Sequence, residues 1–166
     1  MNSKFPQFGT SIFSVMSALA REHQAINLSQ GFPDFDCDPR LAERLYQASQ
    51  AGHNQYAPMP GLPALRQAIA AFCEAAYQLH YDWAQEITIT NGATEALFAT
   101  IMALVSPGEE VIIIEPAYDA YRPAIEMAGG IAVPIPTRAP DYQIDWQQVQ
   151  DALSTRTRLL LLNSPH

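Results

Sequence analysis

Apolar positions recur at helical spacing through the first half of the chain and gather into short runs in the second half. The helical spacing predicts an amphipathic helix over residues 11–23 and further helices over 39–51 and 63–79. Asp38 precedes the second of these helices as an N-cap. Residues 54–63 hold too many prolines for a regular element. The first half is therefore predicted to be helical with extended connections.

In the second half, helical stretches separate the apolar runs. The predicted strands cover residues 87–90, 110–114, 131–135 and 158–162. The predicted helices cover residues 93–104, 118–127 and 146–153, the last with Asp145 as its cap. Runs 111–114 and 159–162 are wholly apolar, as expected for strands buried on both faces, and 159–162 is expected to be central. We therefore predict an α/β fold: a three-layer α/β/α sandwich with a mostly parallel sheet, preceded by an N-terminal helical and extended arm.

Composition narrows the possible functions. The 166 residues are 48% hydrophobic, enough for a real core, and the net charge of −8 argues against a nucleic-acid partner. Cys37 and Cys73 lack C-x-x-C spacing, and the histidines show no metal spacing, so neither a disulfide nor a metal site is expected. No apolar run is long enough for a membrane span, so we expect a soluble cytoplasmic protein. The only lysine is Lys4.

The connection from the predicted strand 87–90 to the next helix carries the clearest chemistry. It runs through Asn91 and Gly92, where glycine can take a positive φ. The first N–H groups of a helix lack intrahelical partners, the helix dipole adds positive charge, and Thr94 adds a hydroxyl. Such a turn can seat a phosphate, although an ordinary connection with a strain-relieving glycine is the alternative. Neither G-x-G-x-x-G nor G-x-x-x-x-G-K-[ST] occurs, so a cofactor smaller than a dinucleotide is expected.

Five segments in order resemble the class I/II aminotransferases, which are pyridoxal 5′-phosphate (PLP) enzymes of fold type I. These segments are Ser29-Gln-Gly-Phe-Pro-Asp-Phe35, Asn54-Gln-Tyr-Ala-Pro-Met-Pro-Gly61, Thr90-Asn-Gly-Ala-Thr-Glu-Ala-Leu97, Glu115-Pro-Ala-Tyr-Asp-Ala-Tyr121 and Asn163-Ser-Pro-His166. The similarity runs from about Ile26 to His166 and is greatest to the branch of methionine aminotransferases and kynurenine or glutamine transaminases.

The resemblance implies cofactor-binding roles for four residues of the second half. The backbone of Gly92, Ala93 and Thr94 is expected to hold the PLP phosphate. Tyr118 is expected to stack on the pyridine ring, because a flat face can hold a planar cofactor in one orientation. A core aromatic at the start of a helix is the alternative for Tyr118.

Two residues of the first half receive roles from the same resemblance. Tyr56 is expected to reach the cofactor phosphate of the other subunit in a homodimer; the alternative is a loop aromatic packed on prolines. Gly31 is expected beside the substrate carboxylate; the alternative is a turn glycine. Phe13, Phe32 and Tyr118 hint at a pocket for an apolar or aromatic side chain.

The resemblance also implies a division of the chain and a limit on its activity. Residues 1–52 would form the arm and part of a small domain, and 53–166 the N-terminal part of the PLP-binding large domain, cut short at its C-terminal end. The family's Schiff-base lysine lies beyond the last residue, Lys4 matches no such position, and no catalytic residue is assigned. Asn163 is at most a neighbour of the site.

The expected function is therefore that of the N-terminal part of a PLP-dependent aminotransferase. The parent enzyme would move an amino group from a methionine, aromatic or glutamine-like amino acid to a 2-oxo acid, and the isolated chain is expected to be inactive. The alternatives are a non-catalytic phosphate- or PLP-binding module and a dimer-partner fragment with an exposed edge at 159–162.

Overall fold

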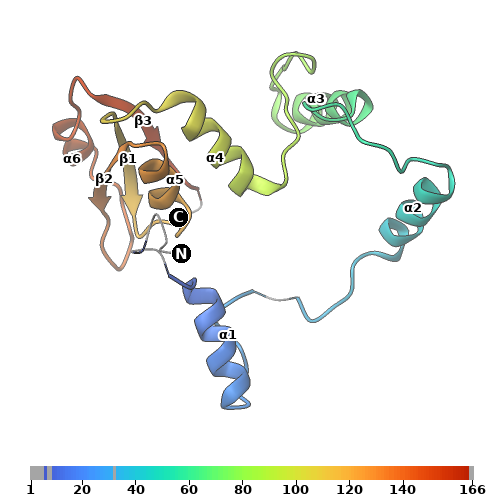
Figure 1. Ribbon diagram of the computed structural model, residues 1–166, viewed down its shortest axis with the longest axis horizontal. Coiled ribbons are helices and arrows are strands. Elements are labelled where there is room, and N and C mark those ends of the chain that lie inside the picture. The colour runs from blue at the N-terminus through green and yellow to red at the C-terminus, as the bar shows by residue number, and fades with distance from the viewer. Residues whose placement is uncertain (1–5, 7–8, 32, 165–166) are drawn as a thin grey trace. The chain divides into compact units, whose positions relative to one another are not determined.

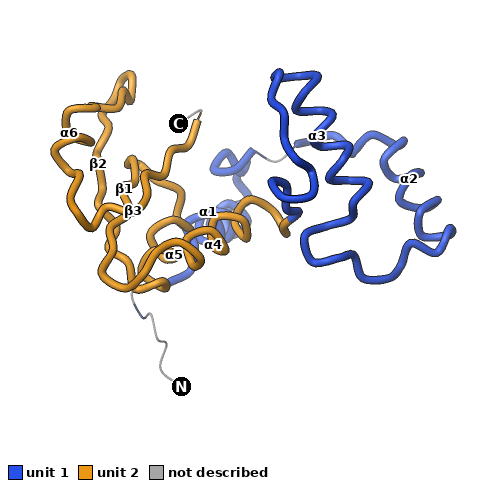
Figure 2. The backbone as a smooth tube through the Cα atoms, turned by 90° about the horizontal axis from the view of Figure 1, so that it is seen from above, with its two compact units in different colours: residues 1–89 blue, residues 90–166 orange. Residues whose placement is uncertain are grey.

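A computed structural model describes residues 6, 9–31 and 33–164 of the chain (Figure 1). The chain divides into two compact units, residues 1–89 (unit 1) and residues 90–166 (unit 2), which Figure 2 shows in different colours. Three residues discussed above, Lys4, Phe32 and His166, lie outside the described residues.

Unit 2 alternates helices and parallel strands. Its elements are α4 (Gly92–Leu104), β1 (Glu110–Glu115), α5 (Tyr121–Met127), β2 (Ile131–Pro136), α6 (Trp146–Asp151) and β3 (Thr157–Leu161). The strand order is β2-β1-β3, and β1 pairs in parallel with both neighbours. The prediction of an α/β fold with a parallel sheet is confirmed.

The core of unit 2 lies on both faces of β1, as expected for a central parallel strand. Val111 and Ile113 pack with α4 and α5 on one face, whereas Ile112 and Ile114 pack with Val149 of α6 on the other. The exposed fraction of these four β1 side chains does not exceed 4%. Helices therefore cover both faces of the sheet, and the predicted three-layer α/β/α sandwich is confirmed.

The strand predicted at 87–90 is wrong. Residues 87–90 form neither helix nor strand, and among the described residues no strand pairs with them. A strand needs a hydrogen-bonded neighbour as well as a β-branched sequence, because each backbone N–H and C=O needs a partner.

The prediction that 159–162 is a central strand buried on both faces is also wrong. Within the described part of the chain β3 is an edge strand, where Leu159 and Leu161 are half-buried and Leu160 is 41% exposed. The helix predicted from residue 118 begins only at Tyr121, so Tyr118 lies in the loop after β1.

The described part of unit 1 consists of three helices and their connections. They are α1 (Ile12–Glu22), α2 (Pro39–Gln50) and α3 (Pro63–Tyr77), close to the predicted bounds. Asp38 caps α2 as predicted, accepting a hydrogen bond from the Arg40 N–H at 2.9 Å. The Arg40 side chain also hydrogen-bonds the Asp38 carboxylate, and this contact lowers the pKa of Asp38. Residues 54–62 form neither helix nor strand, in agreement with their prolines.

Arg66 of α3 holds the segment 84–89, which begins in a turn and then leads toward α4. Its buried guanidinium donates to the Ile87 carbonyl at 2.8 Å and to the Ala84 carbonyl at 2.7 Å, and it lies 5.5 Å from the centre of the Trp83 ring. These contacts take the place of the missing strand pairing for two of the segment's carbonyl groups.

The loop before α3 contributes a second contact with this segment. The Ile89 N–H donates to the Pro60 carbonyl at 3.0 Å. Gly61 has a φ of +102°, and a Cβ atom there would collide with the Ile89 side chain. Only glycine fits this close approach, which explains the glycine at the end of the proline-rich loop.

Candidate functional site

The predicted phosphate turn forms the first turn of α4. Gly92 is the first helical residue and has a φ of +78°, as the sequence predicts. Its own N–H donates to the Thr90 carbonyl at 2.9 Å. Among the described residues, the N–H groups of Ala93 and Thr94 have no hydrogen-bond partner, and both residues are exposed. Gly92 thus shapes the turn, and the next two residues present the N–H groups.

Glu95 forms a hydrogen bond across this turn, a role that the sequence analysis did not identify. The carboxylate of Glu95 accepts a hydrogen bond from the Asn91 N–H, whereas the Asn91 side chain makes no capping hydrogen bond. An acidic side chain in the first turn is also favoured by the helix dipole. The signal that could have revealed it is the spacing of an Asn-Gly turn and a glutamate, which resembles a capping box.

The turn lies toward the edge of the sheet where the parallel strands end. The other end of α4 is placed by Arg158, near the start of β3, whose Nε donates to the Leu104 carbonyl at 2.9 Å. Because α4 therefore begins far from the start of β3, its N-terminus points to the carboxyl ends of the strands. Ligands of open α/β sheets bind at that edge.

A cavity of about 420 Å³ joins the turn to the loop that carries Tyr118. It is lined by Asn91, Thr94 and Glu95 on one side and by Ala120, at the end of that loop, and Pro123 on the other. The structure therefore brings together two sequence segments predicted to contact the same cofactor.

The Tyr118 ring is supported by a residue of the core. Tyr118 is 47% exposed, and its ring meets the buried Tyr121 ring edge-on, with centroids 5.8 Å apart. The Tyr121 N–H donates to the Tyr118 carbonyl at 3.1 Å. Tyr118 is thus a half-exposed aromatic on a held backbone and not a core residue at a helix start.

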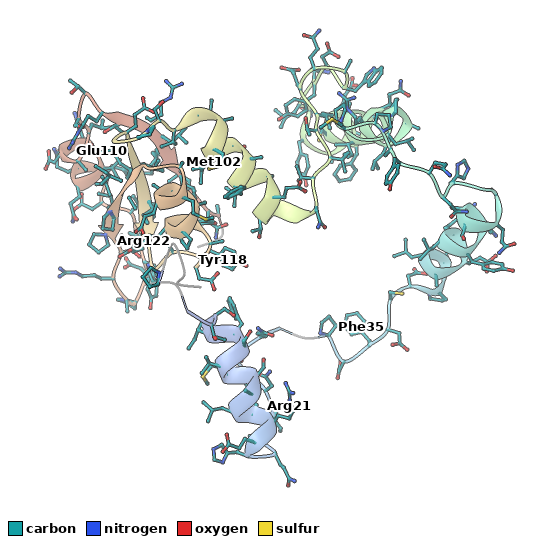
Figure 3. All side chains as sticks on the ribbon, in the orientation of Figure 1. Arg21, Phe35, Met102, Glu110, Tyr118 and Arg122 are labelled. Atoms are coloured by element: carbon teal, nitrogen blue, oxygen red, sulfur yellow. The ribbon has the colours of Figure 1, made fainter. Side chains whose placement is uncertain are left out.

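An ion pair spans the same loop. Arg122 of α5 donates to the Glu115 carboxylate at 3.0 Å, and the N–H and hydroxyl of Thr137 both donate to the Glu115 carbonyl, at 2.7 and 2.8 Å. Figure 3 shows Arg122 and Tyr118 away from Glu110, which begins β1. Arg122, which sequence reasoning passed over, adds a half-exposed positive charge at this edge.

The remaining two predicted site residues, Tyr56 and Gly31, belong to unit 1. The Tyr56 side chain is fully exposed, with a relative accessibility of 101%, so within the described residues it does not pack on the neighbouring prolines. Gly31 is also exposed, and a Cβ atom there would meet nothing within 4 Å.

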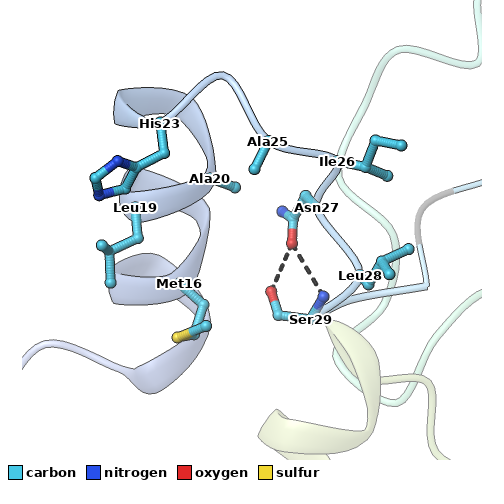
Figure 4. A pocket seen from close by; sticks show the side chains of 9 residues that line it. All are labelled: Met16, Leu19, Ala20, His23, Ala25, Ile26, Asn27, Leu28 and Ser29. Carbon is cyan, nitrogen blue, oxygen red and sulfur yellow. Dashed lines mark hydrogen bonds between the residues drawn. The ribbon is translucent and has the colours of Figure 1, made fainter.

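Unit 1 also contains an apolar groove. It has a volume of about 490 Å³ and lies between α1 and residues 25–29 (Figure 4). Asn27 holds its far wall by accepting hydrogen bonds from the N–H and hydroxyl of Ser29, at 3.1 and 2.6 Å. Neither Gly31 nor Tyr56 lines this groove.

Neither a metal centre nor a membrane-spanning helix is found in the described part of the chain. No group of three or more His, Cys, Asp or Glu side chains there is placed to hold a metal ion. No helix among those residues combines the length and the apolar composition that crossing a bilayer requires.

The donors at the turn fit the phosphate of a PLP-type cofactor. Two unpaired N–H groups, the Thr94 hydroxyl and a helix N-terminus are the chemistry that binds a phosphate. The half-exposed Tyr118 ring, on a loop that lines the same cavity, offers a flat face for a planar ring.

Comparisons with known proteins identify the family of the chain. The family model described as aminotransferase class I and II matches residues 23–166. Over 164 residues the chain is 55% identical to the methionine aminotransferase of Escherichia coli K12, covering 99% of this chain and 42% of that protein. It is 43% identical over 167 residues to a probable N-succinyldiaminopimelate aminotransferase of Mycobacterium tuberculosis, with coverage of 99% and 42%.

A solved structure gives the same result. The crystal structure of YbdL from Escherichia coli, described as having a methionine aminotransferase function, matches with a TM-score of 0.95 and 54% identity, over 100% of this chain and 44% of that one. This chain therefore spans about 42% of the length of the curated relatives named above.

Proposed function

This chain belongs to the aminotransferase class I and II family, and on that premise we propose that it holds the phosphate and ring of PLP in a transaminase. The observation that carries the proposal is the arrangement at the carboxyl edge of the sheet. There the unpaired N–H groups of Ala93 and Thr94 and the loop of Tyr118 share one cavity.

In the proposed mechanism, bound PLP supplies an electron sink that lets an amino group move between an amino acid and a 2-oxo acid. The N–H groups of Ala93 and Thr94 and the Thr94 hydroxyl would bind the phosphate oxygens, helped by the dipole of α4. The Tyr118 ring would stack on the pyridine ring and fix its orientation. Both roles position the cofactor and leave proton transfer to other groups.

The substrates and the assembly are part of the same proposal. We propose an apolar amino acid such as methionine as amino donor, because the chain shares 55% identity with a methionine aminotransferase. A homodimer in which Tyr56 reaches the partner's cofactor phosphate is supported by the full exposure of its side chain. Gly31 beside the substrate carboxylate, the domain division at residue 52 and a cytoplasmic location remain predictions.

We also propose that the 166-residue chain by itself does not complete transamination. Its single lysine is Lys4, which matches no position of the family's Schiff-base lysine. Incubation of the chain with PLP, methionine and a 2-oxo acid is therefore expected to give no turnover. Turnover together with a stoichiometric cofactor adduct on Lys4 would contradict this expectation.

Binding of pyridoxamine 5′-phosphate to the whole 166-residue chain tests the site itself. This form has no aldehyde, so it reports non-covalent binding, and calorimetry should show it binding more tightly than pyridoxamine, which lacks the phosphate. Gly92→Ala should weaken the binding by about tenfold or more, because a side chain is strained at a φ of +78° and tilts the turn.

Gly108→Ala is the matched control for this substitution. Gly108 has a φ of +84°, and the Cβ atoms of both variants meet open space, so the backbone strain is similar while the phosphate turn is left unchanged. Tyr118→Ala should weaken binding by about two- to tenfold and Tyr118→Phe should not, because stacking needs the ring alone. Equal binding of the phosphorylated and unphosphorylated compounds would refute the site.

A further inference from the structure

We infer that Glu95 acts as a built-in anion of the phosphate turn: its carboxylate holds the turn in shape, and its charge limits the affinity for the cofactor phosphate. This inference rests on the proposed phosphate site and adds a positioning and affinity-setting residue to it. Its starting point is the hydrogen bond from the Asn91 N–H to the Glu95 carboxylate.

The hydrogen bond matters because the turn has little other support. Its remaining local contacts are the Gly92 N–H to the Thr90 carbonyl at 2.9 Å and the Thr90 hydroxyl to the Gly92 carbonyl at 3.0 Å. The Asn91 side chain makes no capping hydrogen bond. Glu95 is thus the side chain that ties the residue before α4 to the first turn, and removing its oxygen would free the backbone at Asn91.

The charge of Glu95 acts in the opposite direction on ligand binding. Glu95 follows Thr94 directly and lines the same cavity as Thr94 and Asn91. A phosphate bound at the N–H groups of Ala93 and Thr94 would therefore lie within a few ångströms of a carboxylate. Two like charges at such a distance repel even in water, and salt screens the repulsion.

Two substitutions at Glu95 separate its effect on the shape of the turn from the effect of its charge on phosphate binding. Glu95→Gln keeps an oxygen that can accept from the Asn91 N–H and removes the charge, whereas Glu95→Ala removes both. Calorimetric binding of pyridoxamine 5′-phosphate to the 166-residue chain should be about three- to tenfold tighter for Glu95→Gln than for the wild type at low salt, and the gain should shrink at high salt. Glu95→Ala should bind more weakly than Glu95→Gln.

Glu109→Gln is the matched control, because it removes the same charge beyond the other end of α4. Its carboxylate accepts from the Ser106 N–H at 2.7 Å, and the 13 residues of α4 separate the two sites by about 20 Å. This variant should leave the binding of pyridoxamine 5′-phosphate unchanged within about twofold, because the repulsion between charges in water falls with distance and is weak at about 20 Å even at low salt.

Hydrogen exchange at the Asn91 amide, followed by NMR without ligand, tests the holding role separately. The amide should exchange at least about tenfold faster in Glu95→Ala than in wild type, and Glu95→Gln should stay close to wild type. Equal exchange in all three proteins would overturn the holding role, and binding to Glu95→Gln no tighter than to Glu109→Gln would overturn the affinity-limiting role.

Failure of the proposed function gives a different result. If the wild type binds pyridoxamine 5′-phosphate no better than pyridoxamine, the phosphate site is refuted and the affinity-limiting role falls with it. The exchange of the Asn91 amide then still decides whether Glu95 holds the turn.

Discussion

All buried apolar side chains found among the described residues lie in unit 2, between Ile101 and Val149, whereas the buried residues of unit 1 are Gly61 and Arg66. Unit 2 is ordered around a strand with helices on both faces. In unit 1, two features hold the segment 84–89. One is the buried Arg66 guanidinium, which donates to two of its carbonyl groups, and the other is Gly61, which lets its loop approach Ile89 closely.

The difference shows two ways of stabilising a segment of backbone. Apolar burial is non-directional and grows with area, so unit 2 should tolerate many conservative changes in its core. Hydrogen bonds to carbonyl groups are directional, and a lost partner leaves an unpaired buried group, so unit 1 should depend on single residues. The two tryptophans, Trp83 in unit 1 and Trp146 in unit 2, allow each unit to be followed by fluorescence.

The largest effect should come from the core of unit 2. Ile112→Ala is expected to lower the free energy of unfolding of unit 2 by about 2–5 kcal/mol, because the fully buried side chain leaves a cavity between β1 and α6. Leu45→Ala, at a position 73% exposed in α2, should change stability by less than about 0.5 kcal/mol. Urea unfolding measures the two costs, followed by Trp146 in a Trp83→Phe background for Ile112→Ala and by Trp83 in a Trp146→Phe background for Leu45→Ala. Equal costs would break the comparison.

A smaller effect, confined to unit 1, is expected from Arg66→Met. Methionine keeps much of the apolar length but leaves the carbonyls of Ala84 and Ile87 without their donors, at a cost of about 2–3 kcal/mol. Trp83 fluorescence in a Trp146→Phe background should report it. The exposed Arg44→Met is the control, and a shift of the same size there would show that charge, not the contact with the carbonyls, is responsible.

The smallest effect should be a pH dependence of unit 2. Ser154 donates to the buried Glu110 carboxylate at 2.6 Å and Arg156 pairs with it; the Ser154 hydrogen bond is the main cause that lowers the pKa of Glu110 from its ordinary value of 4.5. A lowered pKa means that the unfolded state takes up the proton first as the pH falls. The contribution of Glu110 to stability is therefore complete above about pH 5 and is lost below its ordinary value.

Glu110→Gln removes this titration and should flatten the stability curve between pH 5 and about pH 3. Urea unfolding at several pH values, followed by Trp146, measures the slope. Glu109→Gln is the control, since the neighbouring glutamate is less buried and is not paired with Arg156. A slope in Glu110→Gln equal to that of the wild type would show that other carboxylates cause the acid sensitivity.

Local features of the sequence predicted most of the elements. The N-caps Asp38 and Asp145 form as expected, because a side-chain oxygen reaches the first N–H groups of its own helix whatever lies beyond it. The apolar run 111–114 is buried because four consecutive apolar side chains need partners on both faces. The positive φ of Gly92 follows from the Asn-Gly pair.

The two strand predictions that failed depended on contacts with residues distant in the chain. The β-branched run 87–90 finds no strand beside it, and carbonyls of this segment bind Arg66 instead. The apolar run 159–162 reads like 111–114, yet β3 is an edge strand among the described strands. How deeply an apolar strand is buried depends on how many strands and helices pack against it, and the strand's own sequence does not specify that number.

For the candidate site, the sequence by itself determined the turn, the helix that follows it and the identity of Tyr118, because these depend on backbone preferences and on motifs. Only the tertiary structure decided that the turn and the Tyr118 loop line one cavity and that Glu95 closes the turn. The physical reason is that both contacts depend on how elements are oriented in the fold. Residues 91 and 120 lie near each other because α4 runs back along the sheet. A backbone N–H forms its hydrogen bond with the acceptor that the folded geometry places in line with it.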